Sequence, residues 1–322
     1  MLLRHARFRI IFAFLLITCA ICFAIYGNRL ITQAAKTEMS ITPRKIGLSY
    51  VRRFSLGFSF KETDASRTWV VGISSPVQKL VAYNNRESQF WVFDLTGRKI
   101  ASFGKAGMRP GEFMTPSGLA FDQNGNLLVA DESIPVIRRY QLNGQYINDA
   151  TPTVPNVAGW SDVAWHDGII IASPSIFSSY HHKQGVRLFK QGKSQEICKH
   201  CFGPVALDAN GLIYLVDKMT PPSEPVLPHL MVFSQTGNTM LRAAFPMVGI
   251  VFDIQYWPEV NGFITTYSGK DTVLLIRDKG RTVEKLLDIA DKSILTLLPM
   301  YNELYVVHTD GQVEVFKLQI AK

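Results

Sequence analysis

The chain has 322 residues and a formal net charge of +8, and 47% of its residues are hydrophobic. The positive excess lies in the N-terminal part: residues 1–53 hold nine Lys or Arg and one acid, whereas residues 54–322 hold 25 basic and 25 acidic residues. A remainder without net charge lacks the basic surface by which proteins bind nucleic acid, so no nucleic-acid partner is expected. Its length suits one domain with one sizeable core.

The first 35 residues form a separate segment, which we predict to be a signal peptide or an uncleaved signal anchor. Arg4, Arg7 and Arg9 precede 17 residues without charge, 10–26. That length is at the lower limit for a helix that spans a membrane. Because the basic residues lie on its N-terminal side, the N-terminus should stay in the cytoplasm and the rest should be exported. We expect a domain anchored on the non-cytoplasmic side of the inner or plasma membrane, or a secreted domain if the leader is cleaved.

A short phrase returns along most of the chain: a large apolar residue, a few polar residues and a Gly. It occurs at residues 93–97, 140–144, 189–192, 233–237 and, more weakly, 276–280, and its Gly residues are 47, 48, 45 and 43 apart. A repeat of this length with several short strands is typical of a β-propeller, in which each repeat forms one blade. The sequence therefore predicts an all-β fold.

Apolar runs bounded by Gly and Asn predict four strands, A to D, in each repeat. In chain order, the predicted strands and blades are 78–84, 89–95 and 98–103 for blade one; 117–122, 126–131, 136–142 and 145–149 for blade two; 161–198 for blade three; 203–243 for blade four; and 250–289 for blade five. The sixth blade begins at Ile294, and the chain ends six residues after Phe316, without room for a strand D. Propellers avoid open edges by closing on themselves, so the missing strand is expected near Ile46–Leu56. These assignments give a six-bladed β-propeller over residues 46–322, preceded by a juxtamembrane linker over residues 36–45.

Residues 103–132 read FGKAGMRPGEFMTPSGLAFDQNGNLLVADE and resemble an NHL repeat. The fourth blade keeps part of the same pattern, whereas Ile134 and Val136 stand where that family tends to have Asn and Arg. The resemblance implies a divergent NHL-like six-bladed propeller, of a kind used mostly for binding and scaffolding. It also implies a second possibility, because related six-bladed propellers include lactonases and a peptidyl-hydroxyglycine lyase that use metals at the central axis.

One sector of the propeller collects soft metal ligands. The B–C loops and D–A connections of a propeller lie on one face, and here they are long at Ser173–Gln184, Met219–His229 and Gly104–Pro116. Long loops on a rigid scaffold usually carry binding. The candidate ligands on this face are Cys198, His200, Cys201, His181, His182 and His229. Thiolate and imidazole together favour zinc or copper. Alternatively, in an oxidising compartment, Cys198 and Cys201 pair as a small-loop disulfide and the His residues are solvated.

Two carboxylates are expected nearer the axis. Asp162 and Asp253 align with Gly118 of blade two near the start of strand A, and equivalent positions on inner strands converge on the central channel. The resemblance to lactonase-type propellers makes them candidate Ca²⁺ or Zn²⁺ ligands; alternatively, they are strand-end carboxylates that bond to backbone N–H groups. Trp160 and Trp257 flank the same face and either line a binding groove or fill the packing between blades.

The sequence favours a binding or scaffold function. No motif for a nucleophile and its base, and no phosphate-binding loop, is present. We expect an exported propeller that holds no cofactor and binds a protein, peptide or glycan through its long-loop face. The alternative is a metal-dependent hydrolase or lyase, lactonase-like or amidating-lyase-like, with Ca²⁺ or Zn²⁺ at the channel mouth.

Overall fold

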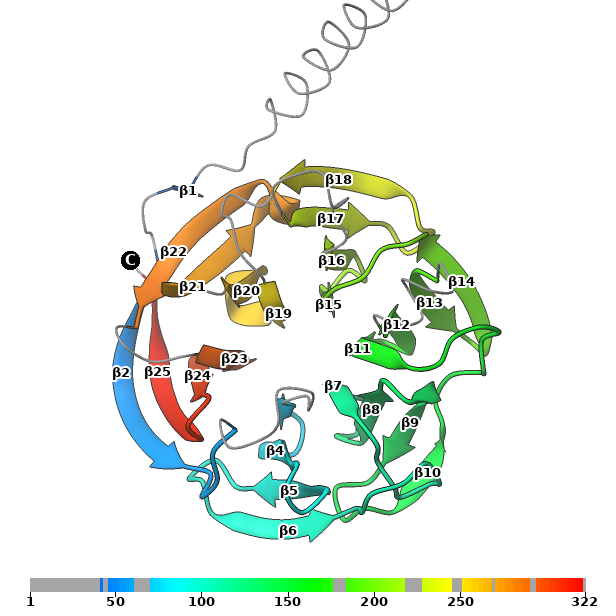
Figure 1. The fold of residues 1–322 in the computed structure, drawn as a ribbon. Helices are drawn as coiled ribbons and strands as arrows, with labels where there is room; N and C mark the ends of the chain where they lie inside the picture. Colours follow the sequence, from blue (N-terminus) through cyan, green and yellow to red (C-terminus); the bar gives the residue numbers. More distant parts are fainter. Residues whose placement is uncertain are drawn as a thin grey trace, which may run out of the picture.

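Six sheets surround a central axis in the computed structural model of this protein (Figure 1). The structure describes residues 41–42, 46–60, 70–175, 184–217, 228–244, 251–267, 270–289 and 294–320. Within these ranges it is all-β, apart from two three-residue 3-10 helices, η2 (Pro258–Val260) and η3 (Asp278–Gly280). The predicted six-bladed β-propeller is confirmed.

Each blade is an antiparallel sheet whose strands follow one another in the sequence, apart from the two strands at the N-terminus. Blades one to three consist of β3 (Val71–Ser74), β4 (Lys79–Asn84), β5 (Gln89–Phe93) and β6 (Lys99–Phe103); β7 (Pro116–Phe121), β8 (Leu127–Asp131), β9 (Ile134–Tyr140) and β10 (Tyr146–Asp149); and β11 (Trp160–His166), β12 (Ile169–Pro174), β13 (Val186–Lys190) and β14 (Lys193–Cys198). Blades four to six contain β15 (Val205–Leu207), β16 (Ile213–Asp217), β17 (His229–Phe233) and β18 (Thr239–Ala244); β19 (Val251–Trp257), β20 (Gly262–Tyr267), β21 (Lys270–Arg277) and β22 (Thr282–Asp288); and β23 (Ile294–Met300), β24 (Glu303–His308) and β25 (Gln312–Ile320).

The N-terminal strand β2 (Ile46–Ser55) completes blade six. It pairs antiparallel with β25 from Ile46 opposite Ile320 to Ser55 opposite Gln312, with a register shift between Tyr50 and Arg52. This pairing matches the closure that the sequence predicts. A shorter strand, β1 (Ile41–Thr42), runs parallel to β22 and adds a fifth strand to blade five. Both N-terminal strands therefore lie at the rim of the propeller (Figure 1).

The hydrophobic core lies between the blades. Strands B are buried along most of their length, and β8 and β16 along all of it, because each is covered on both faces by neighbouring blades. Between blades one and two, for example, Val81 and Phe90 pack against Leu127 and Tyr140. Outer strands such as β10 are exposed along most of their length. Packing between blades therefore holds the ring together, as expected for a propeller.

An Asp side chain and a Gly build the A–B turns of blades two and four. The Asp122 carboxylate accepts hydrogen bonds from the backbone N–H groups of Asn124 and Asn126, at 2.9 and 3.0 Å. Asp208 does the same for Asn210 and Leu212, at 2.8 Å each. Gly125 has a φ of 77°, which a residue with a side chain rarely adopts. An Asx turn and a Gly together fix these tight turns.

The predicted leader, residues 1–35, and the first five residues of the linker lie outside the described residues. In the part of the chain that the structure describes, no helix has the length and apolar character needed to cross a membrane.

Candidate functional site

Asp162 and Asp253 lie on β11 and β19, the innermost strands of blades three and five (Figure 1). Both are half-buried. The Asp162 carboxylate accepts hydrogen bonds from the backbone N–H groups of Val163 and Val205, each at 2.8 Å. The Asp253 carboxylate accepts hydrogen bonds from the side-chain amide of Gln255, at 2.8 Å, and from the hydroxyl of Thr296. Val205 and Thr296 belong to the next blade, so each carboxylate joins two neighbouring blades.

A third link of this kind joins blades two and three. The Ser117 hydroxyl donates a hydrogen bond to the backbone oxygen of Trp160, at 2.8 Å. In all three links the bonded residues are 43 apart in the sequence, which is close to the length of one repeat. The polar groups near the start of strand A therefore connect successive inner strands of the ring.

Asp162 and Asp253 do not by themselves make a metal site. A Ca²⁺ ion takes six to eight oxygen ligands, and both oxygens of Asp162 and of Asp253 already accept hydrogen bonds. In the described ranges, no three His, Cys, Asp or Glu side chains come together where they could hold a metal ion. A metal at these carboxylates would need further ligands and would have to share their oxygens with the bonds between blades.

Trp160 and Trp257 are fully buried, with 0% exposure. The Trp160 ring contacts Phe189 edge-on, with 5.4 Å between ring centroids. The Trp257 indole N–H donates a hydrogen bond of 2.6 Å to the backbone oxygen of Tyr301 in blade six. Neither ring reaches the surface, so in this structure both fill the packing between blades and neither lines a groove.

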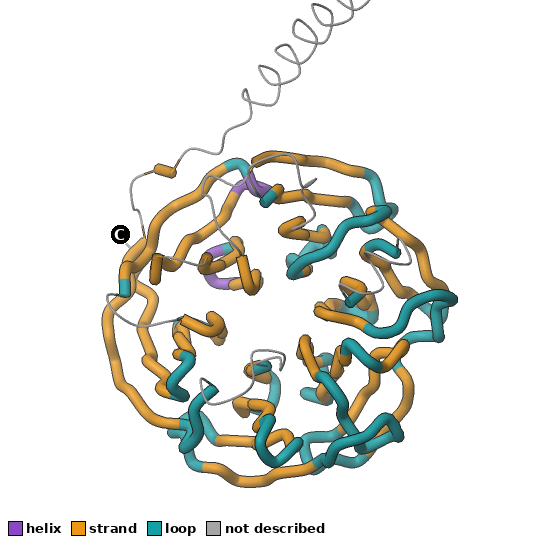
Figure 2. The backbone as a smooth tube through the Cα atoms, viewed as in Figure 1, coloured by secondary structure: helices purple, strands orange, loops and turns teal. Residues whose placement is uncertain are grey.

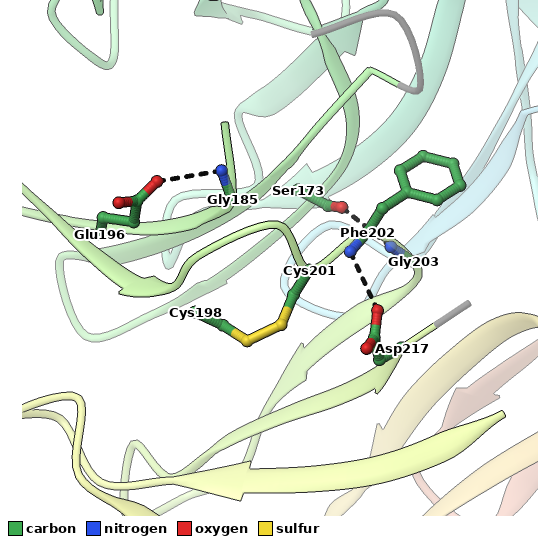
Figure 3. Close-up of a disulfide and its surroundings, with 8 residues drawn as sticks. All are labelled: Ser173, Gly185, Glu196, Cys198, Cys201, Phe202, Gly203 and Asp217. Carbon is green, nitrogen blue, oxygen red and sulfur yellow. Dashed lines mark hydrogen bonds between the residues drawn. A yellow bond between two sulfur atoms is a disulfide. The ribbon is translucent and has the colours of Figure 1, made fainter. Parts of the chain in front are cut away.

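Cys198 and Cys201 form a disulfide, in the connection that leaves β14 for blade four (Figure 3). Cys201 is 5% exposed and packs in the core between blades three and four. Because both sulfurs are bonded to each other, neither is available as a thiolate ligand for zinc. His200 lies exposed between the two cysteines and His229 begins β17, whereas His181 and His182 lie outside the described residues.

The disulfide connection is tied to strands of two blades (Figure 3). The Gly203 N–H donates to the Ser173 hydroxyl at 3.1 Å, and the Phe202 N–H donates to the Asp217 carboxylate at 3.2 Å. Ser173 lies near the end of β12, and Asp217 ends β16. The B–C loops of blades three and four begin at these strand ends, so the connection braces the base of both loops.

The connection from β6 to β7, residues 104–115, is a long loop on the same face as the disulfide connection (Figure 2). Phe113 is 1% exposed and contacts Phe90 and Tyr140 edge-on, at 4.7 and 5.3 Å between centroids. The Arg138 guanidinium donates hydrogen bonds to the backbone oxygens of Met108 and Arg109, at 2.7 and 2.9 Å. A buried aromatic ring and a charged side chain therefore fix the loop at two points.

Asp131, at the end of β8, fixes the loop at a third point. Its carboxylate accepts hydrogen bonds from the backbone N–H groups of Met114, Thr115 and Ser133, at 2.9 to 3.1 Å. Burial raises the pKa of Asp131, and this effect outweighs the lowering by the three N–H donors. The carboxylate thus accepts hydrogen bonds from backbone N–H groups just before β7 that would otherwise lack a partner.

The braced loop exposes two large apolar side chains. Met108 and Met114 are each 53% exposed, although the backbone at both residues is held by the bonds to Arg138 and Asp131. Sequence reasoning identified the length of this loop but not these two residues. The sequence signal for them was the presence of two Met residues in a Gly-rich loop. Their exposure could not be predicted from the sequence, because it depends on the contacts that hold the loop.

Comparisons with known proteins agree with the fold. The family model DUF5128, described as a 6-bladed beta-propeller, matches residues 72–159. The chain is similar to a protein provisionally described as a gluconolactonase, with 13% identity over 86% of this chain and 95% of that chain and a TM-score of 0.61. It is also similar to a gluconolactonase from Xanthomonas campestris (15% identity, 86% and 95% coverage, TM-score 0.58) and a virginiamycin B lyase from Staphylococcus aureus (10%, 79% and 82%, 0.55). Identities this low support the shared fold alone.

Proposed function

We propose that the protein is an exported binding protein that recognises an apolar segment of a protein or peptide through its long-loop face. The observation that carries this proposal is the loop of residues 104–115, whose backbone is held while Met108 and Met114 are exposed. A loop ordered before binding loses little conformational entropy when it binds. Met side chains are flexible and polarisable, so they adapt to different apolar partners.

Export and membrane attachment are part of the same proposal. The basic and apolar leader supports insertion with the propeller on the non-cytoplasmic side. The disulfide between Cys198 and Cys201 supports an oxidising compartment, because structural disulfides are rare in the reducing cytosol.

The alternative function is a metal-dependent hydrolase or lyase at the channel mouth. The similarity to gluconolactonases and to a lyase supports this alternative only at the level of the fold. Against it stand the hydrogen bonds that occupy Asp162 and Asp253. The two functions differ in one requirement, since the alternative needs about one tightly held metal per chain.

The test uses the full chain, purified in detergent without chelator, and a displayed library of peptides. We expect the enriched peptides to carry apolar residues, and Met108→Ser with Met114→Ser to weaken their binding about tenfold or more, since central apolar contacts each contribute about 1 kcal/mol or more. Met240→Ser is the matched control, because Met240 is 48% exposed on β18.

Three results would contradict the proposal. Equal weakening by the Met240 control would remove the role of the loop. Enrichment of glycans and not of peptides, in a parallel glycan array, would replace the partner class. A stoichiometric metal, together with loss of that metal in Asp162→Asn or Asp253→Asn, would support the hydrolase or lyase.

A further inference from the structure

The rim of the propeller at β2 exposes three consecutive residues, two of which are large and apolar. Ser49, Tyr50 and Val51 are all exposed, and the register shift between Tyr50 and Arg52 leaves Val51 without a partner on β25. A bulge of this kind breaks the alternation of inward and outward side chains. Tyr50 is 58% exposed and Val51 is 43% exposed. They are the only sequence neighbours among the exposed large hydrophobic residues of the described ranges.

Cationic side chains accompany this apolar pair. Arg53 is exposed two residues further along β2, and Lys317 is exposed on β25 directly opposite Ser49. Arg52, between them, is held by Glu303 and Tyr305. We call Ser49, Tyr50, Val51, Arg53 and Lys317 the β2 rim patch. Ser49 and Lys317 lie on one face of blade six, whereas Tyr50, whose ring packs edge-on against Phe316 at 5.9 Å between centroids, lies on the other, so the patch extends around the edge strand. It combines an aromatic ring with a phenol hydroxyl, an aliphatic side chain and two positive charges.

The sequence before the patch supports a particular occupant. The apolar leader ends at Tyr26, and 19 residues separate it from Ile46, the first residue of β2. This stretch contains Arg29, Lys36, Arg44 and Lys45 and a single acid, Glu38. Because β1 (residues 41–42) pairs with β22, 14 residues, 27–40, separate the leader from the propeller rim. At about 3.3 to 3.6 Å per extended residue they reach roughly 45 to 50 Å, which permits rim contact with the bilayer.

We infer that the β2 rim patch rests in the head-group layer of the anchoring membrane, on anionic lipid of the non-cytoplasmic leaflet. Tyr is favoured at the boundary between water and lipid, where its ring and its hydroxyl meet different surroundings. Basic residues near an anionic leaflet each gain attraction that falls off within a Debye length. The inference rests on the proposed membrane anchoring and adds an orientation: the propeller lies with the rim of blade six against the bilayer.

The test places a photo-crosslinking benzophenone side chain at position 50 of the full chain, reconstituted in vesicles of phosphatidylcholine with or without phosphatidylglycerol. Position 240, exposed on the rim of blade four, is the control. Lipid adducts are expected at position 50 well above those at position 240, and more with phosphatidylglycerol. Arg53→Gln should lower them about fivefold on anionic vesicles, the attraction of one cation, whereas Lys193→Gln, at an exposed residue of β14, should leave them unchanged.

Flotation of the same vesicles separates the inference from the proposed anchoring. If the chain floats but position 50 gives no more lipid adducts than position 240, the rim contact is wrong and the anchor stands. Adducts from position 50 to a second copy of the chain would replace the membrane with self-association. Failure to float would overturn the anchor and the rim contact together, while leaving peptide binding by the long-loop face as a separate measurement.

Discussion

Arg52 and Glu303 are 251 residues apart in the sequence, and their side chains form a two-point ion pair with both N···O distances at 3.1 Å. Arg52 lies on β2 and Glu303 on β24, with β25 between them in the sheet. The Tyr305 hydroxyl joins the pair: it accepts from Arg52 at 3.0 Å and donates to Glu303 at 2.7 Å. This cluster holds the closing strand across its neighbour, in addition to the backbone pairing.

The ion pair predicts a pH-dependent contribution to stability. Burial alone would raise the pKa of Glu303, but the hydrogen bonds from Arg52 and Tyr305 lower this pKa below 4.5. A carboxyl with a lowered pKa stabilises the fold above its unfolded value and loses that contribution as pH falls through the folded value. Glu303→Gln should therefore cost up to about 1 kcal/mol at neutral pH, since the pair is partly exposed and screened, and the difference from wild type should disappear in acid.

Urea unfolding at neutral and at acidic pH measures this difference. Asp167→Asn is the control, because Asp167 is exposed in the turn between β11 and β12. A Glu303→Gln cost that persists unchanged in acid would rule out the ion pair as its cause.

At Gly118 the close packing of blades two and three leaves no room for a side chain. A Cβ at Gly118 would lie 2.7 Å from the Cα of Asp162, which is backbone that cannot turn away. Gly118→Ala should destabilise the fold by about 1–3 kcal/mol through overpacking. At Gly47 a Cβ would meet the Cβ of Gln319 at 3.5 Å, an ordinary contact. Thermal unfolding of Gly118→Ala beside Gly47→Ala tests the difference, and equal melting temperatures would contradict it.

The disulfide predicts a modest effect on stability and a local effect on dynamics. Cys198 and Cys201 close a very short loop, so the entropy model gives about 2 kcal/mol for their bond. Reduction by a dithiol should lower stability by that amount and speed amide exchange at Phe202 and Gly203, whose N–H groups bond to Asp217 and Ser173. Cys198→Ala with Cys201→Ala should give the same result and no response to reductant. A response in the double variant would place the redox effect elsewhere.

The hydrogen bonds of Asp131 lead us to expect that a change at this buried carboxylate weakens peptide binding by the exposed Met residues. Asp131→Asn keeps the shape but replaces one acceptor oxygen by an amide donor, which faces backbone N–H groups. An orphaned buried donor costs about 1–3 kcal/mol, and peptide binding at Met114 should weaken with it. Amide exchange at Met114 and Thr115, measured beside peptide affinity, tests this. Faster exchange with unchanged affinity would separate the loop from the binding face.

The repeat phrase was enough to predict the ring, because each phrase marks one C–D turn and the turns recur once per blade. Strand bounds were close but not identical: β9 begins at Ile134 and not at residue 136, because the B–C turn after Asp131 is only two residues long. The closing strand could be predicted because an incomplete last blade requires a partner. Periodicity and turn chemistry, both local in the sequence, carry this information.

The candidate site was harder to predict, because it depends on contacts between distant residues. Alignment placed Asp162 and Asp253 near the axis but could not reveal that Val205 and Thr296 of the neighbouring blades donate hydrogen bonds to their oxygens. It placed Trp160 and Trp257 on the same face, which is wrong: Trp160 begins β11 and Trp257 ends β19, so they lie at opposite ends of equivalent inner strands, and both are buried. The exposure of Met108 depends on Arg138, 30 residues away. Such contacts follow from the assembled ring and not from any one repeat.

The pairing of β2 with β25 also determines when blade six can form during synthesis. During synthesis, residues 46–55 emerge before blades one to five, and residues 312–320 emerge after them, so blade six cannot form until the other five blades have been made. Contacts between segments far apart in the sequence are slow to form, and an unpaired strand is prone to mispairing until its partner exists. A chain that crosses a membrane during synthesis would therefore complete its ring only after export, beside the bilayer that its first residues have already entered.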